Sequence, residues 1–419
     1  MENNFVGIDL GTTTCYCTYF DHAGQLSYFP YEGNECIHSV ISYTNSKWYI
    51  GKKAYADGKN KGCTFFELKR IVGKKYDDQS FEKDMRHWPF NVVRGENDMA
   101  EIEYEVIERG SDKTMVRRES PESLISRFLK KIKDYMSNQY FQGVSELRAV
   151  ITVPERFNEL QVKLIVQAAR QAGFDDVHVF SEPSAAGLAY VKANKDVMEG
   201  KNILVYDLGG GTFDVSIIHY ENNTFSVQAT DGDTHLGGSD VDSLLVDWYL
   251  SETRLKEKIE LNKASMSRIK RMCEENKIML CGGHESIAFF NPLCDKDDEK
   301  VPTLSRWKLR EKIRPFLEKT TTITERCVTK WKEKYPDQDI AGILMVGGGS
   351  YIWRVVSDKE REHMLPYRRL DFGGIDSIKA VSRGACLRGM HFEMISRVHE
   401  LLLFINYSLT KFIFILDII

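Results

Sequence analysis

The sequence predicts an α/β fold made of two similar lobes around a cleft. Short apolar strands alternate with helix-like segments along the 419 residues, which is the pattern of sheets covered by helices. One layout occurs twice, at residues 7–13 (GIDLGTT) and 206–212 (YDLGGGT), where a strand ends in Asp and a Gly/Thr turn leads to another strand. A chain of this length lets each lobe bury its own core.

The individual elements follow from the positions of the apolar runs. Strands are predicted near Asn4–Asp9, Cys15–Phe20, Leu147–Val153, Asn202–Asp207, Val215–His219 and Gly342–Val346. Helices are predicted at Glu122–Tyr140, Asn158–Ala172, Val241–Leu250, Arg306–Lys332 and Val381–Gly389. A mostly polar run over 194–201 precedes the second copy of the layout, so we place lobe one at 1–195, lobe two at 196–390 and an apolar C-terminal tail at 391–419.

Composition excludes several classes of protein. The formal net charge is only −4, so no broad basic surface for nucleic acid is expected. The nine cysteines show no C-x-x-C spacing for a zinc site, and the first residues show no basic region followed by an apolar run, so secretion is not expected and we expect a reduced compartment, the cytoplasm. Because Asn406, Lys411 and Asp417 interrupt the apolar tail, a docked element or a truncated continuation is favoured over a membrane anchor.

The two Gly/Thr turns are candidate phosphate-binding loops. Backbone N–H groups and hydroxyls at Gly11, Thr12 and Thr13 suit phosphate oxygens, although one such loop alone is equally well explained as a tight turn. Two loops of the same layout, facing each other across a cleft, would hold a polyphosphate from both sides. The carboxylates of Asp9 and Asp207 at the strand ends would then hold a hydrated magnesium ion.

A third glycine cluster, MVGGGS at 345–350, follows another strand and offers a flat surface for a base or ribose, or is simply a strand-to-helix turn. The sequence contains neither the G-x-x-x-x-G-K-[ST] motif nor the G-x-G-x-x-G fingerprint. A P-loop enzyme and a dinucleotide-binding enzyme of the usual type are therefore not expected.

Several motifs together resemble the Hsp70 chaperones. They are GIDLGTT (7–13), ELKRIVG (67–73), AVITVPERF (149–157), SEPSAAGLAY (181–190), ILVYDLGGGTFDVS (203–216) and GDTHLGG (232–238). They occur in family order and cover the chain from residue 5 to about residue 390. The resemblance implies an actin-like ATPase fold, with two ribonuclease H-like lobes around a nucleotide cleft, that binds ATP or ADP with Mg2+ and K+.

The resemblance also implies roles for individual residues. The catalytic set would be Lys69, Glu182, Asp207 and Thr212, and the metal set Asp9, Asp207 and Asp214. Viewed alone, Lys69 would be read as a solvated helix residue and Glu182 as a loop carboxylate. Residues expected at the nucleotide are Gly11, Thr12, Thr13, Thr14, Gly209, Gly210, Gly211, Gly237, Gly238, Glu274, Lys277, Cys281, Gly347, Gly348, Gly349 and Ser350.

The sequence departs from the family pattern at the adenosine. Ile278 and Tyr351 stand where arginines are expected, and Cys281 stands where a serine is expected. Since arginine stacks on adenine and isoleucine offers only apolar contact, we expect an altered affinity for the base.

Other departures bear on partners. The resemblance implies a J-domain co-chaperone and a nucleotide exchange factor as partners, and chaperone work in protein folding. Val162 and His178 replace arginines of the family pattern, which weakens the expectation of coupling to a substrate domain and of J-domain contact. The sequence stops at Ile419, before the family's peptide-binding domain, so direct holding of peptide is not expected.

Two rival functions remain open on the sequence. A small-molecule kinase of the same superfamily would share the phosphate loops but needs a carboxylate base beside an acceptor pocket, which no motif announces. A nucleotide-gated module without hydrolysis would tolerate loss of Lys69, Glu182 and the aspartates, yet all of them are present. The Hsp70-type ATPase is the favoured hypothesis.

Overall fold

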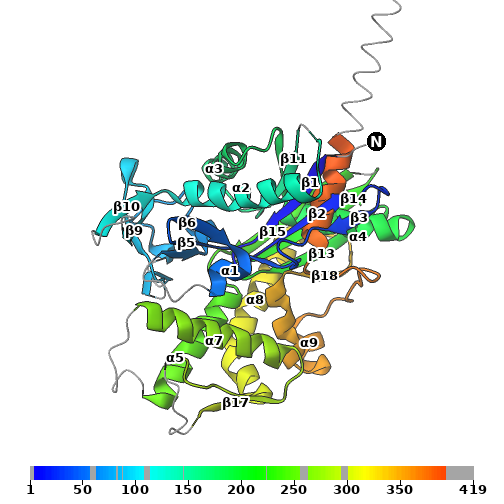
Figure 1. Cartoon of the computed structure of the whole chain (residues 1–419). Coiled ribbons are helices and arrows are strands. Elements are labelled where there is room, and N and C mark those ends of the chain that lie inside the picture. Colours follow the sequence, from blue (N-terminus) through cyan, green and yellow to red (C-terminus); the bar gives the residue numbers. More distant parts are fainter. Residues whose placement is uncertain are drawn as a thin grey trace, which may run out of the picture.

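Two main sheets organise the molecule. A computed structural model describes residues 4–56, 63–81, 84–86, 88–107, 114–144, 146–222, 224–254, 263–293 and 301–392. Within these ranges the fold is mixed α/β, as predicted, and Figure 1 shows the sheets between one group of helices that includes α2 and α3 and another that includes α5, α7 and α9.

The first sheet lies in the N-terminal half of the chain. Its strand order is β12-β11-β1-β2-β3, and β4 also pairs with β2. Its strands are β1 (Phe5–Leu10), β2 (Thr14–Phe20), β3 (Leu26–Tyr28), β4 (Ile37–His38), β11 (Arg148–Val153) and β12 (Val177–Ser181).

The second sheet lies in the C-terminal half and has the order β15-β14-β13-β18. Its strands are β13 (Lys201–Leu208), β14 (Phe213–Glu221), β15 (Thr224–Asp233) and β18 (Ile340–Val346). In both sheets the Asp-bearing strand pairs antiparallel with the next strand and parallel with a later one: β1 with β2 and β11, and β13 with β14 and β18. The repeated sequence layout is therefore also a repeated pairing.

Smaller sheets and the helices surround these two sheets. The remaining strands are β5 (Val40–Thr44), β6 (Lys47–Ile50), β7 (Thr64–Phe66), β8 (Asn91–Arg94), β9 (Ala100–Ile107), β10 (Thr114–Glu119), β16 (Ser286–Ala288) and β17 (Thr303–Ser305). The helices are α1 (Gly51–Ala56), α2 (Pro121–Gln139), α3 (Glu159–Gln171), α4 (Glu182–Met198), α5 (Gly238–Thr253), α7 (Lys263–Cys281), α8 (Arg306–Lys334) and α9 (Asp358–Met364). Short 3-10 helices are η1 (Leu68–Arg70), η2 (Gln79–Phe81), η3 (Asp84–Arg86), η4 (Glu96–Asp98) and η5 (Gly348–Val355).

Local signals explain where the long helices begin. The Ser120 side chain accepts from the N–H of Ser123 at the start of α2, and Pro121 is the first helical residue. Asn158 and Gln161 form a reciprocal capping box at the start of α3.

The predicted strands and helices are all present, with ends shifted by a few residues. Helix α4 has a non-helical residue, Asn194, close to the predicted lobe boundary.

The last described helix, over 380–392, returns to the start of the chain. A Cβ added to Gly7 would lie 2.2 Å from the backbone N of Cys386, and one added to Gly384 would lie 1.8 Å from the carbonyl oxygen of Ala185. Glycines at these two positions let this helix contact β1 and α4 backbone to backbone.

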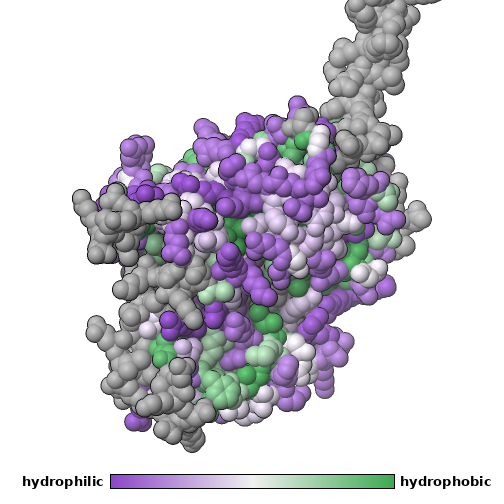
Figure 2. Space-filling model, in the orientation of Figure 1, coloured by the Kyte–Doolittle hydropathy of each residue, from purple (hydrophilic) through white to green (hydrophobic). Residues whose placement is uncertain are grey.

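The face in Figure 2 is mostly hydrophilic, with hydrophobic residues gathered in its lower part.

Candidate active site

The two Gly/Thr loops contact each other across the two halves of the chain. A Cβ added to Gly210 would lie 2.1 Å from Thr13 Oγ1, and a Cβ on Gly211 would lie 2.5 Å from the side chain of Thr12. Asp9 and Asp207 are the last residues but one of β1 and β13, directly before these loops. The structure thus brings together the two loops that the sequence predicted to face each other.

A third segment packs on the second loop. The backbone N–H groups of Gly238 and Ser239 donate to the carbonyl oxygens of Gly209 (3.0 Å) and Gly210 (2.7 Å). Helix α5 begins here, so its positive N-terminal end lies beside the loops, which favours an anion.

The third glycine cluster also adjoins the second loop. Gly347 has φ +79°, and a Cβ there would lie 2.4 Å from the carbonyl oxygen of Leu208. A Cβ on Gly349 would lie 2.5 Å from the carbonyl oxygen of Gly209, whereas one on Gly348 would meet no atom within 4 Å. Ser350 Oγ donates to the carbonyl oxygen of Gly347 at 2.7 Å, which fixes the start of η5.

Lys69 is buried rather than solvated. It lies in η1, is 8% exposed, and its Nζ donates to Glu182 Oε1 at 2.7 Å. Glu182 is the first residue of α4 and is also buried. Tertiary placement therefore contradicts the interpretation of Lys69 as a solvated helix residue, since η1 turns its ammonium inward onto α4.

Three buried aspartates surround this pair. Burial, followed by the negative charge of Glu182, raises the pKa of Asp9 to about 7 and that of Asp214 to about 7. The same two causes raise the pKa of Asp207 well above its usual range, with Asp214 and Asp9 adding to the effect. Thr212 donates to Asp214 and Thr152 to Asp9, which partly opposes the rise. Lys69 lowers the pKa of all three aspartates and Arg156 also lowers that of Asp214, but burial and the charge of Glu182 outweigh these cations.

This donor set fits a hydrated divalent cation better than a directly enclosed one. Over the described residues, no three or more His, Cys, Asp or Glu side chains form a group that would hold a metal ion directly. The raised pKa values nevertheless indicate that nearby cations do not fully neutralise these buried carboxylates. Mg2+ could neutralise them without direct contact, because it keeps several of its waters when it binds to proteins. Asp9, Asp207 and Asp214 would contact such an ion through water.

Helix α7 brings its predicted residues to the cleft. A cavity of about 70 Å3 opens beside Thr12 and Thr13 and is lined from both halves of the chain, including Tyr55 and Glu274. The Tyr55 hydroxyl donates to Glu274 Oε2 at 2.7 Å, and this hydrogen bond joins α1 to α7 across one side of the cavity.

Lys277 and its neighbours differ in exposure. Lys277 Nζ donates to the carbonyl oxygen of Gly238 (2.9 Å) and contacts Asp242 Oδ1 (2.7 Å). Burial alone would lower the pKa of Lys277, but the charges of Asp242 and Glu274 outweigh it and raise that pKa. Cys281 is buried, which raises its pKa to about 11, whereas Ile278 is 59% exposed.

Tyr351 has partners of its own instead of an open face. Its hydroxyl donates to Asp376 Oδ1 at 3.0 Å, and the Arg354 guanidinium lies 3.8 Å from its ring centroid. Arg354 therefore supplies a stacked guanidinium three residues after the position where the family pattern has an arginine.

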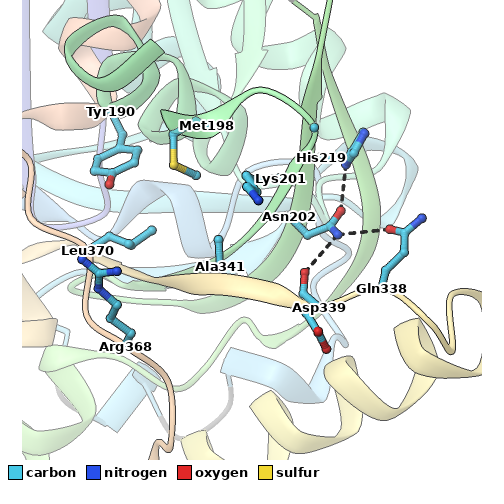
Figure 3. Close-up of a pocket in the computed structure, with 11 residues that line it drawn as sticks. Tyr190, Met198, Lys201, Asn202, His219, Gln338, Asp339, Ala341, Arg368 and Leu370 are labelled. Carbon is cyan, nitrogen blue, oxygen red and sulfur yellow. Dashed lines mark hydrogen bonds between the residues drawn. The ribbon is translucent and has the colours of Figure 1, made fainter. Parts of the chain in front are cut away.

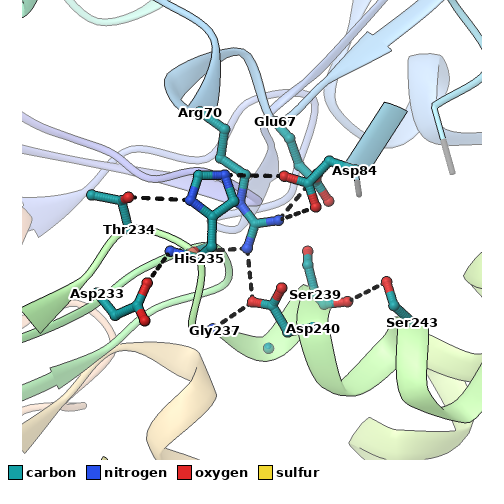
Figure 4. Close-up of polar contacts among 12 residues, drawn as sticks. Glu67, Arg70, Asp84, Asp233, Thr234, His235, Gly237, Ser239, Asp240 and Ser243 are labelled. Carbon is teal, nitrogen blue, oxygen red and sulfur yellow. Dashed lines mark hydrogen bonds and ion pairs between the residues drawn. The ribbon is translucent and has the colours of Figure 1, made fainter. Parts of the chain in front are cut away.

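A polar network that the sequence did not predict joins the two halves at Arg70 (Figure 4). Arg70 is 3% exposed and donates to Asp84 Oδ1 (2.9 Å), the carbonyl oxygen of Gly211 (2.8 Å) and Asp240 Oδ2 (2.8 Å). His235 Nε2 lies 3.2 Å from Asp84 Oδ2. The only sequence signal was the position of Arg70 beside Lys69, and it does not identify partners 141 to 170 residues away.

Comparison with known proteins gives the family. The family model described as Hsp70 protein matches residues 5–411. The chain belongs to the Hsp70 family. Its similarity to a heat shock cognate HSP70 protein of Trypanosoma brucei brucei is 32% identity over 83% of this chain and 50% of that protein. Similarity to a ribosome-associated molecular chaperone of Zygosaccharomyces rouxii is 32% identity over 92% of this chain and 60% of that protein.

A mitochondrial heat shock 70 kDa protein of Pisum sativum is 31% identical over 92% of this chain and 55% of its own length. The chain thus spans about half to three fifths of these relatives. The tail predicted at 391–419 lies outside the described residues, apart from 391 and 392. No helix in the described ranges is long and apolar enough to cross a membrane.

Proposed function

We propose that this member of the Hsp70 family binds ATP and hydrolyses it slowly to ADP and phosphate in the presence of Mg2+. The observation that carries the proposal is the buried Lys69–Glu182 pair, which lies among three aspartates beside two touching Gly/Thr loops. Phosphoryl transfer depends mainly on positioning and charge neutralisation, and this arrangement supplies both.

The two sheets support an actin-like fold with two ribonuclease H-like lobes as part of the same proposal. Each sheet carries its Asp and its Gly/Thr loop on the strand that pairs with one antiparallel and one parallel neighbour. The lobes would correspond to residues 1–195 and 196–390, with the nucleotide between them.

Each residue then has a role. Lys69 would hold its ammonium at the terminal phosphate, while Glu182, Asp207 and Thr212 orient the attacking water. Mg2+, when bound, would neutralise phosphate charge, and its waters would be held by Asp9, Asp207 and Asp214; K+ would bind in the same acidic region. The raised pKa values of the three aspartates support this assignment, because a nearby cation would offset their burial and mutual repulsion.

The nucleotide contacts follow from the same segments. Phosphates would lie on the backbone of the loops at 11–14 and 209–211 and at the start of α5, near Gly237 and Gly238. The adenosine would lie against α7, near Glu274, Lys277 and Cys281, and against the backbone of the glycine cluster at 347–350. Exposed Ile278 in place of an arginine supports weakened contact with the base.

Partners and location extend the proposal. By family, a J-domain co-chaperone and a nucleotide exchange factor would act on the chain in protein folding. His178 Nε2 lies 2.8 Å from Asp176 Oδ2, and the His178 ring stacks on Phe392 with ring centroids 4.1 Å apart. These contacts support a weakened J-domain contact at that position. The cytoplasm is the proposed compartment, although one relative is named as mitochondrial.

Single-turnover hydrolysis of ATP with Mg2+ and K+, run beside Lys69→Ala, tests the proposed activity. We expect slow hydrolysis by the wild type and a loss of about a hundredfold or more in the variant, because electrostatic stabilisation of the transition state is removed. Lys53→Ala, at an exposed position in α1, is the matched control. Equal hydrolysis by Lys69→Ala would overturn the site, and sugar-dependent turnover would favour a kinase instead.

A further inference from the structure

A second cavity, of about 580 Å3, opens where β13 and β18 begin. Its lining includes none of the residues assigned to nucleotide or metal. Figure 3 shows Tyr190, Leu370 and Arg368 on one side and Asn202 with its hydrogen-bonded partners on the other. The volume lies within the range of about 300–1,000 Å3 that is typical of small-molecule sites.

Backbone pairing fixes one side of the cavity. The N–H of Ile343 donates to the carbonyl oxygen of Arg368 (2.8 Å), and the N–H of Leu370 donates to that of Ile343 (2.9 Å). A Cβ on Gly342 would lie 2.5 Å from the Arg368 carbonyl oxygen, so glycine permits this close approach. Arg368 and Leu370 line this cavity, as alternation along an extended segment allows, whereas Arg369 lines only a neighbouring pocket, which Arg368 also borders.

The opposite side is held by satisfied polar groups. Asn202 Nδ2 donates to Gln338 Oε1 and to the carbonyl oxygen of Asp339, both at 3.1 Å. The Asn202 oxygen is then the acceptor for His219 Nδ1 at 2.8 Å. These hydrogen bonds fix Asn202 and form the floor of the cavity.

Two cations and a hydroxyl remain open. Lys201 and Arg368 are exposed, and no carboxylate lies within 4.0 Å of either in the part of the chain that the structure describes. Asp339 does not offset them, because its side chain is 98% exposed and pairs with Lys332. The Tyr190 hydroxyl finds no hydrogen-bond partner among the described residues. Burial raises the Tyr190 pKa, Arg368 opposes that rise, and the charge of Asp371 adds to it.

An apolar wall completes the cavity. It consists of Met198, Ala341, Leu370 and the ring of Tyr190, which Phe372 supports from its edge at 5.8 Å. Apolar surface beside two uncompensated cations suits a ligand with an apolar body and one negative group.

We propose that this cavity binds small amphipathic carboxylates. The carboxylate would lie on the two cations and the Tyr190 hydroxyl, and the alkyl or aryl body on the apolar wall. This site does not depend on the proposed ATPase activity, because it shares no residue with the nucleotide site.

Titration calorimetry of the purified full chain with octanoate tests the proposal. We expect saturable binding of one octanoate, at least about tenfold weaker binding to Arg368→Glu, and a similar loss in Lys201→Glu, because charged hydrogen bonds are removed. Arg369→Glu carries the same charge change at a residue that does not line this cavity and should bind octanoate as the wild type does.

Two further ligands separate charge from apolarity. Octyltrimethylammonium has the same chain with the opposite charge, and acetate has the charge without the chain; both should bind at least about tenfold more weakly than octanoate. Equal binding of octyltrimethylammonium, equal binding of octanoate to Arg368→Glu and Arg369→Glu, or no saturable octanoate binding would each overturn the proposal. A thermal melt confirms that the variants are folded before affinities are compared.

Discussion

Lys69 Nζ donates to Glu182 Oε1 at 2.7 Å between two side chains that are only 6% and 10% exposed. One residue belongs to a 3-10 turn and the other to the start of a helix 113 residues later. A buried ion pair of this kind is seldom a source of stability, since desolvation offsets the attraction. Its persistence here is consistent with a role in chemistry.

The pair allows a double-mutant cycle. Lys69→Met leaves Glu182 buried without its cation, so we expect the free energy of unfolding at pH 8 to fall by about 3–5 kcal/mol. Lys69→Met combined with Glu182→Gln should recover a large share of that loss, because the unpaired charge is gone. Urea denaturation of Lys69→Met, Glu182→Gln and the double variant measures the coupling, and additive losses would contradict a direct pair.

The raised pKa of Asp214 predicts a pH dependence with a definite sign. The folded-state value of about 7 exceeds the ordinary value of 3.8, so the folded state holds the proton more tightly. This group therefore costs stability as pH rises from about 4 to about 7, and the cost stays constant above that.

Asp214→Asn removes this cost. Without Mg2+ or nucleotide, we expect the variant to be more stable than the wild type at pH 8, on the order of 2 kcal/mol. The difference should shrink toward pH 5, and hydrolysis should fall in the same variant. Urea denaturation at pH 8 and pH 5 measures the difference in stability between the variant and the wild type. A variant that is less stable than the wild type at pH 8 would show that Asp214 is ionised without strain.

Arg70 should be needed for contact between the two halves. Arg70→Gln removes donors to Asp84, Asp240 and the Gly211 carbonyl, and leaves two carboxylates without their cation. We expect a loss of about 3–5 kcal/mol in the free energy of unfolding and weaker binding of nucleotide. Arg94→Gln is the control, since its pair with Asp98 is half exposed and should cost about 0–1 kcal/mol.

Tyr55 should slow the release of nucleotide. Tyr55→Phe removes only the hydroxyl that donates to Glu274 across the cavity beside the phosphate loops. Losing one such hydrogen bond should accelerate release of a fluorescent ADP about two- to tenfold, as measured by stopped-flow chase. Tyr49→Phe on neighbouring β6 is the control, and an equal effect of both changes would argue against the bridge.

The sequence predicted the features that depend on local pattern. The strands ending in Asp9 and Asp207, the loops after them and the long helices all have a local cause, such as apolar runs, glycine turns and caps. The repeated layout also predicted that the two loops would face each other, and the contact of Gly210 with Thr13 confirms it.

The features that the sequence did not predict depend on tertiary contacts. Lys69 donates to Glu182 from η1, which follows a left-handed residue, Glu67 (φ 55°), and no local pattern in the sequence predicts this conformation. The Arg70 network and the Tyr55–Glu274 bridge join residues 141 to 219 positions apart. Each of these side chains, taken alone, is an ordinary polar residue in the sequence.

The glycine contacts of the helix over 380–392 have a consequence for synthesis on the ribosome. This helix contacts β1 at Gly7 and α4 at Ala185, so the first strand made is covered by the last described helix. At about 5–20 residues per second, β1 would wait roughly 20–80 seconds for that cover. During elongation its apolar face is open to chaperones and to aggregation, so a member of a chaperone family would itself depend on protection while it emerges.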